Sequence, residues 1–203
     1  MFLDTWGKEI AADKGALDRY RKQVLLRASL ESTYDYYVTD PADDRKGTYY
    51  PFFKGVSTSI EFVTLSSVFY GDIPAIARLK VVPYQAESGS KELCRLSYEE
   101  APLDRTYVKY AGSPIRFKRS MVVYAGYLHC RFRYFGEWKT RFSPEKNGFE
   151  TSYKWQDTFS GRERQTIPEK IELTLDNGAG KIRLIFFIRT YNLYKRGFFR
   201  HEF

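Results

Sequence analysis

The chain is poor in the residues from which catalytic and metal sites are most often built. Its 203 residues include only two histidines, His129 and His201, and two cysteines, Cys94 and Cys130. Two histidines are too few ligands for a zinc site, and no His-Glu-x-x-His, Cys-x-x-Cys or glycine-rich phosphate-binding motif is present. The sequence therefore predicts no metal, no cofactor and no catalytic residue, and we expect a protein that is not an enzyme.

Long hydrophobic runs are also missing. A membrane-spanning helix needs about 18 or more predominantly apolar residues, and the best run here, Leu184–Ile188, is much shorter and is typical of a buried strand. The opening residues, Phe2–Trp6, are too polar for the apolar core of a signal peptide. We therefore expect either a cytosolic protein or the soluble part of a protein whose membrane anchor is missing from this chain.

The two cysteines leave two alternatives open. In an oxidising compartment Cys94 and Cys130 would form one disulfide, and in a reducing one they would be small buried apolar groups. Sequence does not decide whether their Cα atoms approach closely enough for a bond. His129 next to Cys130 has the composition of a base beside a nucleophile, but neighbouring residues of a strand face opposite sides of a sheet. We expect these two side chains to be separated.

Positive charge and aromatic rings are abundant. The net charge is +8, and the 17 Tyr and 16 Phe favour strands and partner interfaces. A basic protein can bind nucleic acid, acidic polymers or anionic lipid. Here, however, the 33 basic residues are interleaved with 25 acidic ones, and the densest basic stretch is only Arg116–Arg119, with Lys139 and Arg141 further on. A solvated basic surface is the simpler interpretation.

A helix is predicted over about residues 11–38, with Asp13 as its N-cap. An apolar stripe at helical spacing supports it. The stripe contains Leu17, Tyr20, Val24 and Ala28, widened by Leu26, Leu30 and Tyr34 or Tyr37. It fits two interpretations: a helix that covers the core of its own chain, or the lower half of a longer helix whose N-terminal part is missing.

From Tyr49 onward the sequence predicts strands and turns. Asp176–Gly180 is a strong hairpin signal because Asn-Gly adopts the positive φ angles of tight turns, and Ala86–Lys91 reads as a polar hairpin loop. Short turns predict antiparallel pairing. The expected strands are Ser59–Leu65, Ala75–Tyr84, Glu92–Tyr98, Met121–Tyr134, Glu150–Trp155, Lys170–Leu175 and Lys181–Tyr191.

These elements predict one domain over residues 1–203. It would comprise the helix at about 11–38, a β-rich head at about 49–191 and a basic aromatic tail at 192–203. The expected fold class is α+β, with the N-terminal helix packed on antiparallel sheets. The tail either docks on a partner or a membrane surface, or folds back as a last strand.

Two groups of acidic residues do not by themselves predict a functional site. Asp40, Asp43 and Asp44 lie in the loop Thr39–Gly47, where hard cations such as calcium would find oxygen ligands. Their spacing matches no calcium-binding loop, so solvated carboxylates are the simpler interpretation. The neighbouring acids Glu99 and Glu100 do not by themselves identify an acid–base pair.

One run supports a nucleic-acid-binding alternative. Strand alternation places on one face Tyr127, His129, Arg131, Arg133 and Phe135. A basic, aromatic strand face can stack bases while it binds phosphates. The simpler interpretation is a strand whose other face is core and whose arginines meet solvent or acidic neighbours.

Taken in order, these runs resemble a type II secretion minor pseudopilin of the J type. The resemblance covers about Val24 to Leu175. It is carried by Phe53-Lys54-Gly55 followed by Ser59–Thr64, by Arg78–Tyr84 and Leu93–Leu96, by Leu128–Tyr134 ahead of Trp138 and Trp155, and by Ile167–Leu175. The family also begins with a basic leader, a Gly-Phe cleavage motif and a hydrophobic helix carrying a Glu. None of these is found here, which suggests a chain without its anchor or a divergent relative.

The resemblance implies a pilin-like fold and a structural role without turnover. Such a protein sits at the tip of the pseudopilus and assembles with the I- and K-type minor pseudopilins through helix and head contacts. It implies a periplasmic head, held at the inner membrane by an N-terminal helix absent here. Leu17, Tyr20 and Val24 are the candidates for helix contact. Two alternatives remain open: a pilin-like nucleic-acid-binding protein of the competence type, although we do not expect nucleic acid as a partner, and an envelope β-sandwich that is an enzyme or binds a ligand.

Overall fold

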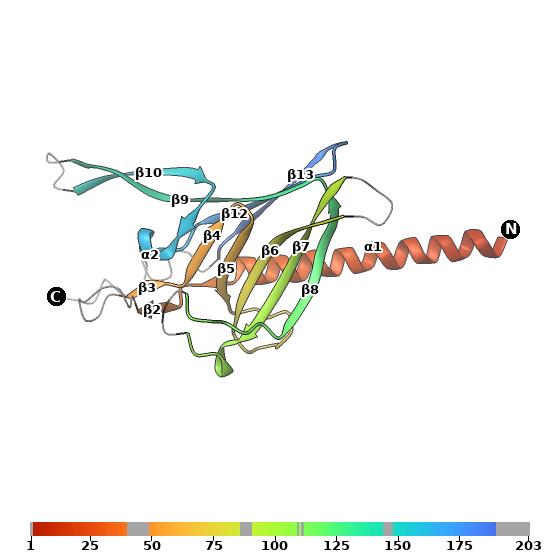
Figure 1. Ribbon diagram of the computed structural model, residues 1–203, viewed down its shortest axis with the longest axis horizontal. Coiled ribbons are helices and arrows are strands. Elements are labelled where there is room, and N and C mark those ends of the chain that lie inside the picture. Colours follow the sequence, from red (N-terminus) through yellow and green to blue (C-terminus); the bar gives the residue numbers. More distant parts are fainter. Residues whose placement is uncertain are drawn as a thin grey trace.

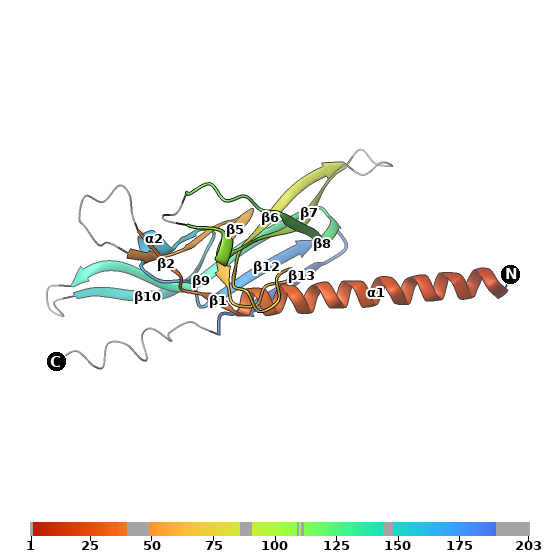
Figure 2. The same ribbon diagram turned by 90° about the horizontal axis from the view of Figure 1, so that it is seen from below.

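The computed structural model describes residues 2–39, 49–85, 91–108, 110, 112–143 and 148–189. The protein is mostly β, so the expected α+β, pilin-like fold class is wrong. Helix α1 (Phe2–Glu31) leads into two main antiparallel sheets and projects well beyond them (Figure 1). Seen from below, it runs along one side of the sheets and leaves them behind towards the N-terminus (Figure 2).

The fold class differs from the expectation because α1 is not a full layer of the fold. Between residues 16 and 25 every side chain except Lys22 is exposed. Among residues 16–31 of the helix, whose side chains the structure describes, the buried ones lie at its end and are Leu26, Ser29, Leu30 and Glu31. The apolar faces of the sheets are therefore covered mainly by each other rather than by the helix.

Helix α1 begins and ends earlier than the predicted range of 11–38. Side-chain hydroxyls end it: Ser32 donates to the carbonyl of Ala28 at 2.7 Å, and Thr33 donates to the carbonyl of Leu30 at 2.7 Å. Carbonyls of the last turn lack helical donors, so these bonds satisfy them. The chain then continues as strands β1 (Thr33–Tyr34) and β2 (Tyr37–Thr39), which take Tyr34 and Tyr37 out of the predicted helical stripe.

The larger sheet has seven strands in the order β11-β4-β5-β6-β7-β8, with β1 paired to β5. All its pairings are antiparallel. The bounds are β4 Phe53–Val56, β5 Ser59–Thr64, β6 Ala75–Gln85, β7 Glu92–Pro102, β8 Arg119–Tyr127 and β11 Phe159–Ser160.

The smaller sheet has four antiparallel strands in the order β10-β9-β12-β13. Its bounds are β9 His129–Ser143, β10 Gly148–Gln156, β12 Lys170–Asp176 and β13 Lys181–Phe187. The predicted hairpin at Asp176–Gly180 is confirmed, and Gly178 has a φ of 85°. The remaining elements are β3 (Tyr49–Pro51), which pairs with β2, the 3-10 helix η1 (Leu103–Arg105) and the short helix α2 (Gly161–Arg164).

Most predicted strands are confirmed within a few residues, but the single strand Met121–Tyr134 is wrong. The chain leaves the larger sheet after Tyr127 and enters the smaller one at His129. Gly126 has a φ of 87°, and the N–H of Leu128 donates to the carbonyl of Asp176 at 2.7 Å. Positive φ is open to glycine at low cost, so the run of strand-forming residues bends here from one sheet to the other.

The core lies between the two sheets and the end of α1. Tyr134 of β9 is central to it: its ring packs edge-on against Phe53 with centroids 5.9 Å apart, and its hydroxyl donates to the carbonyl of Val56 at 2.8 Å. A smaller cluster packs on the other face of the larger sheet and contains Val38, Tyr50, Phe52, Val63, Ile76 and Val108. The larger sheet therefore buries apolar side chains on both of its faces.

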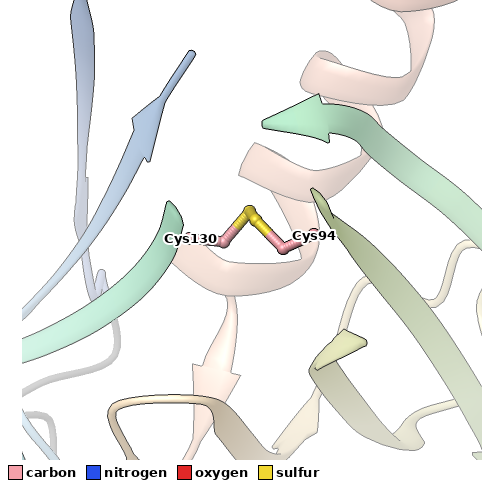
Figure 3. The surroundings of a disulfide bond; sticks show 2 residues. All are labelled: Cys94 and Cys130. Carbon is pink, nitrogen blue, oxygen red and sulfur yellow. A yellow bond between two sulfur atoms is a disulfide. The ribbon is translucent and has the colours of Figure 1, made fainter. Parts of the chain in front are cut away.

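A disulfide joins the sheets. Cys94 of β7 and Cys130 of β9 are bonded, with their Cα atoms 6.3 Å apart (Figure 3). The alternative of two separate buried thiols, open from sequence, does not apply to this structure.

Two buried phenols are expected to make the stability of the fold depend on pH in the alkaline range. Burial, and then the charge of Glu100, raises the pKa of Tyr98 well above its ordinary value, and burial does the same for the pKa of Tyr134. The pKa of each phenol is higher in the folded state than in the unfolded state. Below the unfolded-state pKa of about 10, the phenols therefore make their full contribution to the free energy of unfolding. This contribution is lost as the pH rises through the folded-state pKa values. We expect the urea midpoint to fall above about pH 10.

That expectation is measured by urea titration at a series of pH values, with Tyr107→Phe as the control. Tyr107 is 84% exposed, so its removal leaves the alkaline fall unchanged. A urea midpoint that stays constant up to about pH 11 would contradict the role of the buried phenols.

Candidate functional site

The exposed part of α1 carries large apolar side chains. Leu17 is 57% exposed, Tyr20 64% and Val24 46%. These are the three residues predicted for helix contact, and their spacing places them on one side of the helix. Leu25, 40% exposed, extends this surface. We call these four residues the helix surface.

The predicted apolar stripe divides where the helix meets the sheets. Leu26 and Leu30 are fully buried, whereas Leu17, Tyr20 and Val24 remain in solvent. The interpretation of the stripe as a core-covering face thus holds for the last turns only. Sequence reasoning missed Leu25, because it lies off the stripe and next to the buried Leu26.

Two hollows adjoin the helix surface. One, of about 240 Å³, is lined by Tyr20, Gln23, Val24, Arg27, Tyr124, Leu184 and Phe186. The other, of about 480 Å³, is lined by Asp18, Tyr20, Arg21, Lys22, Val24, Leu25 and Met121. Since β8 and β13 are the outermost strands of their sheets, the helix leaves the head between two sheet edges. The hollows therefore join the helix surface to the head.

Buried polar contacts fix the base of the helix. The hydroxyls of Ser29 and Tyr98 lie 2.7 Å apart, and Tyr98 also donates to the carboxylate of Glu100. At the last helical residue, Glu31 accepts from Arg27 at 2.8 Å and from Arg189 at 2.8 Å. The direction of α1 relative to the head is thus set by hydrogen bonds as well as by apolar packing.

Glu100 has a structural environment rather than a catalytic one. Its carboxylate is fully buried and accepts from the Ser67 hydroxyl at 2.7 Å and from the N–H groups of Val68 and Phe69 at 2.8 and 3.0 Å. These bonds hold the loop after β5 against β7. With the bond from Tyr98, the carboxylate has four donors and is well satisfied.

Glu99 points to the opposite side of the strand and has different partners. Arg78 donates to it at 2.8 Å and Lys80 at 3.2 Å. Burial alone would raise the pKa of Glu99, but the bonds and charges of these two cations hold it below its ordinary value. Glu99 and Glu100 therefore do not converge as an acid–base pair.

The predicted nucleic-acid face is only partly assembled. His129, Arg131, Arg133 and Phe135 share the outer face of β9, but Tyr127 lies on β8 in the other sheet. The Asp157 carboxylate lies 2.6 Å from Arg131 and 3.5 Å from Arg133. Phosphates would have to compete with this carboxylate, which weakens the face as a binding surface for nucleic acid.

The other sequence candidates that fall within the described residues form no site. Cys130 lies in the disulfide, so His129 has no thiol beside it. Among the described residues there is no group of three or more His, Cys, Asp and Glu that could hold a metal ion. Several candidates lie outside the described residues: Asp40, Asp43, Asp44, His201 and the tail 192–203, together with the side chains of Lys139 and Arg141.

No helix within the described ranges has the length and apolar character needed to span a bilayer. Comparison with models of known protein families and with curated proteins found no match to this chain.

Proposed function

We propose that the protein is a structural subunit of an envelope filament, namely a J-type minor pseudopilin of a type II secretion system. It acts at the tip of the pseudopilus, without turnover, and binds I- and K-type minor pseudopilins. The observation that carries the proposal is the helix surface, which leaves apolar side chains in solvent on a helix that projects from the head.

Helix-to-helix packing accounts for these exposed side chains. Ridges of side chains on one helix fit into the grooves of another, and apolar residues at such contacts are removed from water. Hollows that continue from the helix to the head offer room for side chains of the neighbour. Contiguous exposed apolar patches on soluble proteins mark interaction sites.

The disulfide supports an envelope location for this subunit. Disulfides form and persist in oxidising compartments such as the bacterial periplasm and are rare in the cytosol. A bond between Cys94 and Cys130 therefore suits a periplasmic head.

The proposal predicts that charge placed on the helix surface disrupts assembly. In the double variant Leu17→Asp and Val24→Asp, recovery of the I- and K-type partners with the full-length protein from its native envelope is expected to fall at least about tenfold, because a desolvated carboxylate has no counter-charge in an apolar contact. Recovery is measured by quantitative mass spectrometry of the purified complex, and secretion by export of a type II substrate.

Arg19→Asp is the matched control. Arg19 is an exposed residue of the same helix on the side away from Leu17 and Val24, and its substitution should leave recovery and secretion close to wild type. If wild-type protein recovers no pseudopilin, or recovers nucleic acid instead, the proposed function is wrong.

A further inference from the structure

Three aromatic rings and one lysine form a row across the outer face of the smaller sheet. Trp155 of β10 pairs in register with Phe135 of β9, Phe135 with Lys170 of β12, and Lys170 with Phe187 of β13. Each strand thus contributes one residue. With strands about 4.8 Å apart, the row spans about 14 Å. We call it the aromatic row.

The aromatic row faces away from the core. Tyr134, Ile171 and Phe186, which neighbour row residues along three of the strands, are buried between the sheets, so alternation turns the row outward. Phe187 is 56% exposed. Tyr153 adds a further ring: it is 51% exposed and stacks on Phe135 with centroids 6.1 Å apart. The row is therefore accessible at Phe187 and next to Tyr153, whereas Trp155, Phe135 and Lys170 are half-buried.

A single ammonium group lies within the row. Nζ of Lys170 is 4.6 Å from the ring centroid of Phe135 and 5.4 Å from that of Phe187, within the range of cation–π contacts. In the part of the chain that the structure describes, Lys170 forms no ion pair with a carboxylate. Its neighbours on both sides are aromatic, and none of the described acidic residues is paired with it.

The arginines next to the row are already paired. Arg133 lies 3.5 Å from the carboxylate of Asp157, and Arg183 lies 3.2 Å from that of Glu172. A strand of phosphates would need several unpaired cations, whereas Lys170 needs one carboxylate. The charges around the row therefore favour an acidic protein surface over a nucleic acid.

We propose that the aromatic row binds the head of a neighbouring minor pseudopilin, which places a carboxylate on Lys170 and apolar side chains on Phe187 and Trp155. This inference rests on the proposed function and adds a second contact, separate from α1. Aromatic residues flanked by polar pairs have the composition of interface hot spots. The net charge of +8 favours an acidic partner and disfavours a second copy of this chain.

The test measures the affinity of the full chain for the purified heads of the I- and K-type minor pseudopilins of the same organism. Lys170→Glu and Phe187→Ala are each expected to raise the dissociation constant for one of these heads at least about tenfold. Lys118→Glu is the matched charge control, because Lys118 is exposed on the segment before β8. Circular dichroism checks that each variant is folded, and a single-stranded oligonucleotide is titrated in parallel.

The outcomes separate this inference from the proposed function. Loss of affinity in both row variants, with Lys118→Glu close to wild type, supports the row as the docking site. Binding that is equal in wild type and row variants overturns the row but leaves the proposed function standing. If wild-type protein binds neither head, both fail. A different result would also overturn the inference: the protein binds the oligonucleotide but neither head, and Lys170→Glu weakens that binding. The row would then be a nucleic-acid-binding surface.

Discussion

Replacing Glu100 by alanine is expected to lower the free energy of unfolding by about 3 to 5 kcal/mol. The substitution leaves a cavity and removes the acceptor of the Ser67 hydroxyl, of the Val68 and Phe69 N–H groups and of the Tyr98 hydroxyl. Buried donors that lose their acceptor keep their desolvation cost without compensation. The loss is measured by urea denaturation near neutral pH.

Glu99→Ala is the control for this experiment. Glu99 adjoins Glu100 on β7, but its side chain is 19% exposed and its partners Arg78 and Lys80 also reach solvent. Ion pairs of this kind contribute about 0 to 1 kcal/mol, so a much smaller loss is expected. Similar losses in the two variants would show that the buried position of Glu100 is not what makes it important.

Removing the disulfide is expected to cost about 4 kcal/mol of stability. The bond between Cys94 and Cys130 spans a sequence separation of 36 residues. By the chain-entropy relation, its removal frees a loop of that length in the unfolded chain and so stabilises the unfolded state. The double variant Cys94→Ala and Cys130→Ala is compared with the oxidised wild type by urea denaturation.

Wild-type protein kept reduced during the titration is the control for the disulfide. It retains both sulfur atoms and should lose nearly as much stability as the double variant, which separates the missing cross-link from altered packing. If both lose less than about 1 kcal/mol, the cross-link contributes little and the core packing alone holds the sheets together.

Strands with one buried face could be predicted well from sequence. In β12, Ile171, Leu173 and Leu175 alternate with polar residues, and all three are fully buried. The departure of the chain from one sheet to the other near Gly126 could not be predicted, because residues on both sides have strand composition. The bend depends on the contact between Leu128 and Asp176, which are distant in sequence.

For the candidate site, too, local sequence patterns could be predicted, whereas features that depend on contacts between distant residues could not. Periodicity placed Leu17, Tyr20 and Val24 on one side of a helix. It could not distinguish these exposed residues from the buried Leu26 and Leu30. The point where the sheets begin to cover α1 depends on tertiary structure, which the spacing of apolar residues does not contain. The aromatic row was missed for a related reason. Its members come from four strands, and only the register brings Lys170 between Phe135 and Phe187.

The anchored base of α1 has a mechanical consequence. Ser29 is bonded to Tyr98 on β7, and the same strand carries Cys94, whose disulfide leads to β9 in the other sheet. Tension or torque applied along the helix therefore passes through hydrogen bonds into one strand and then through a covalent bond into both sheets. Under such a load the helix and the head are expected to turn together as one rigid body.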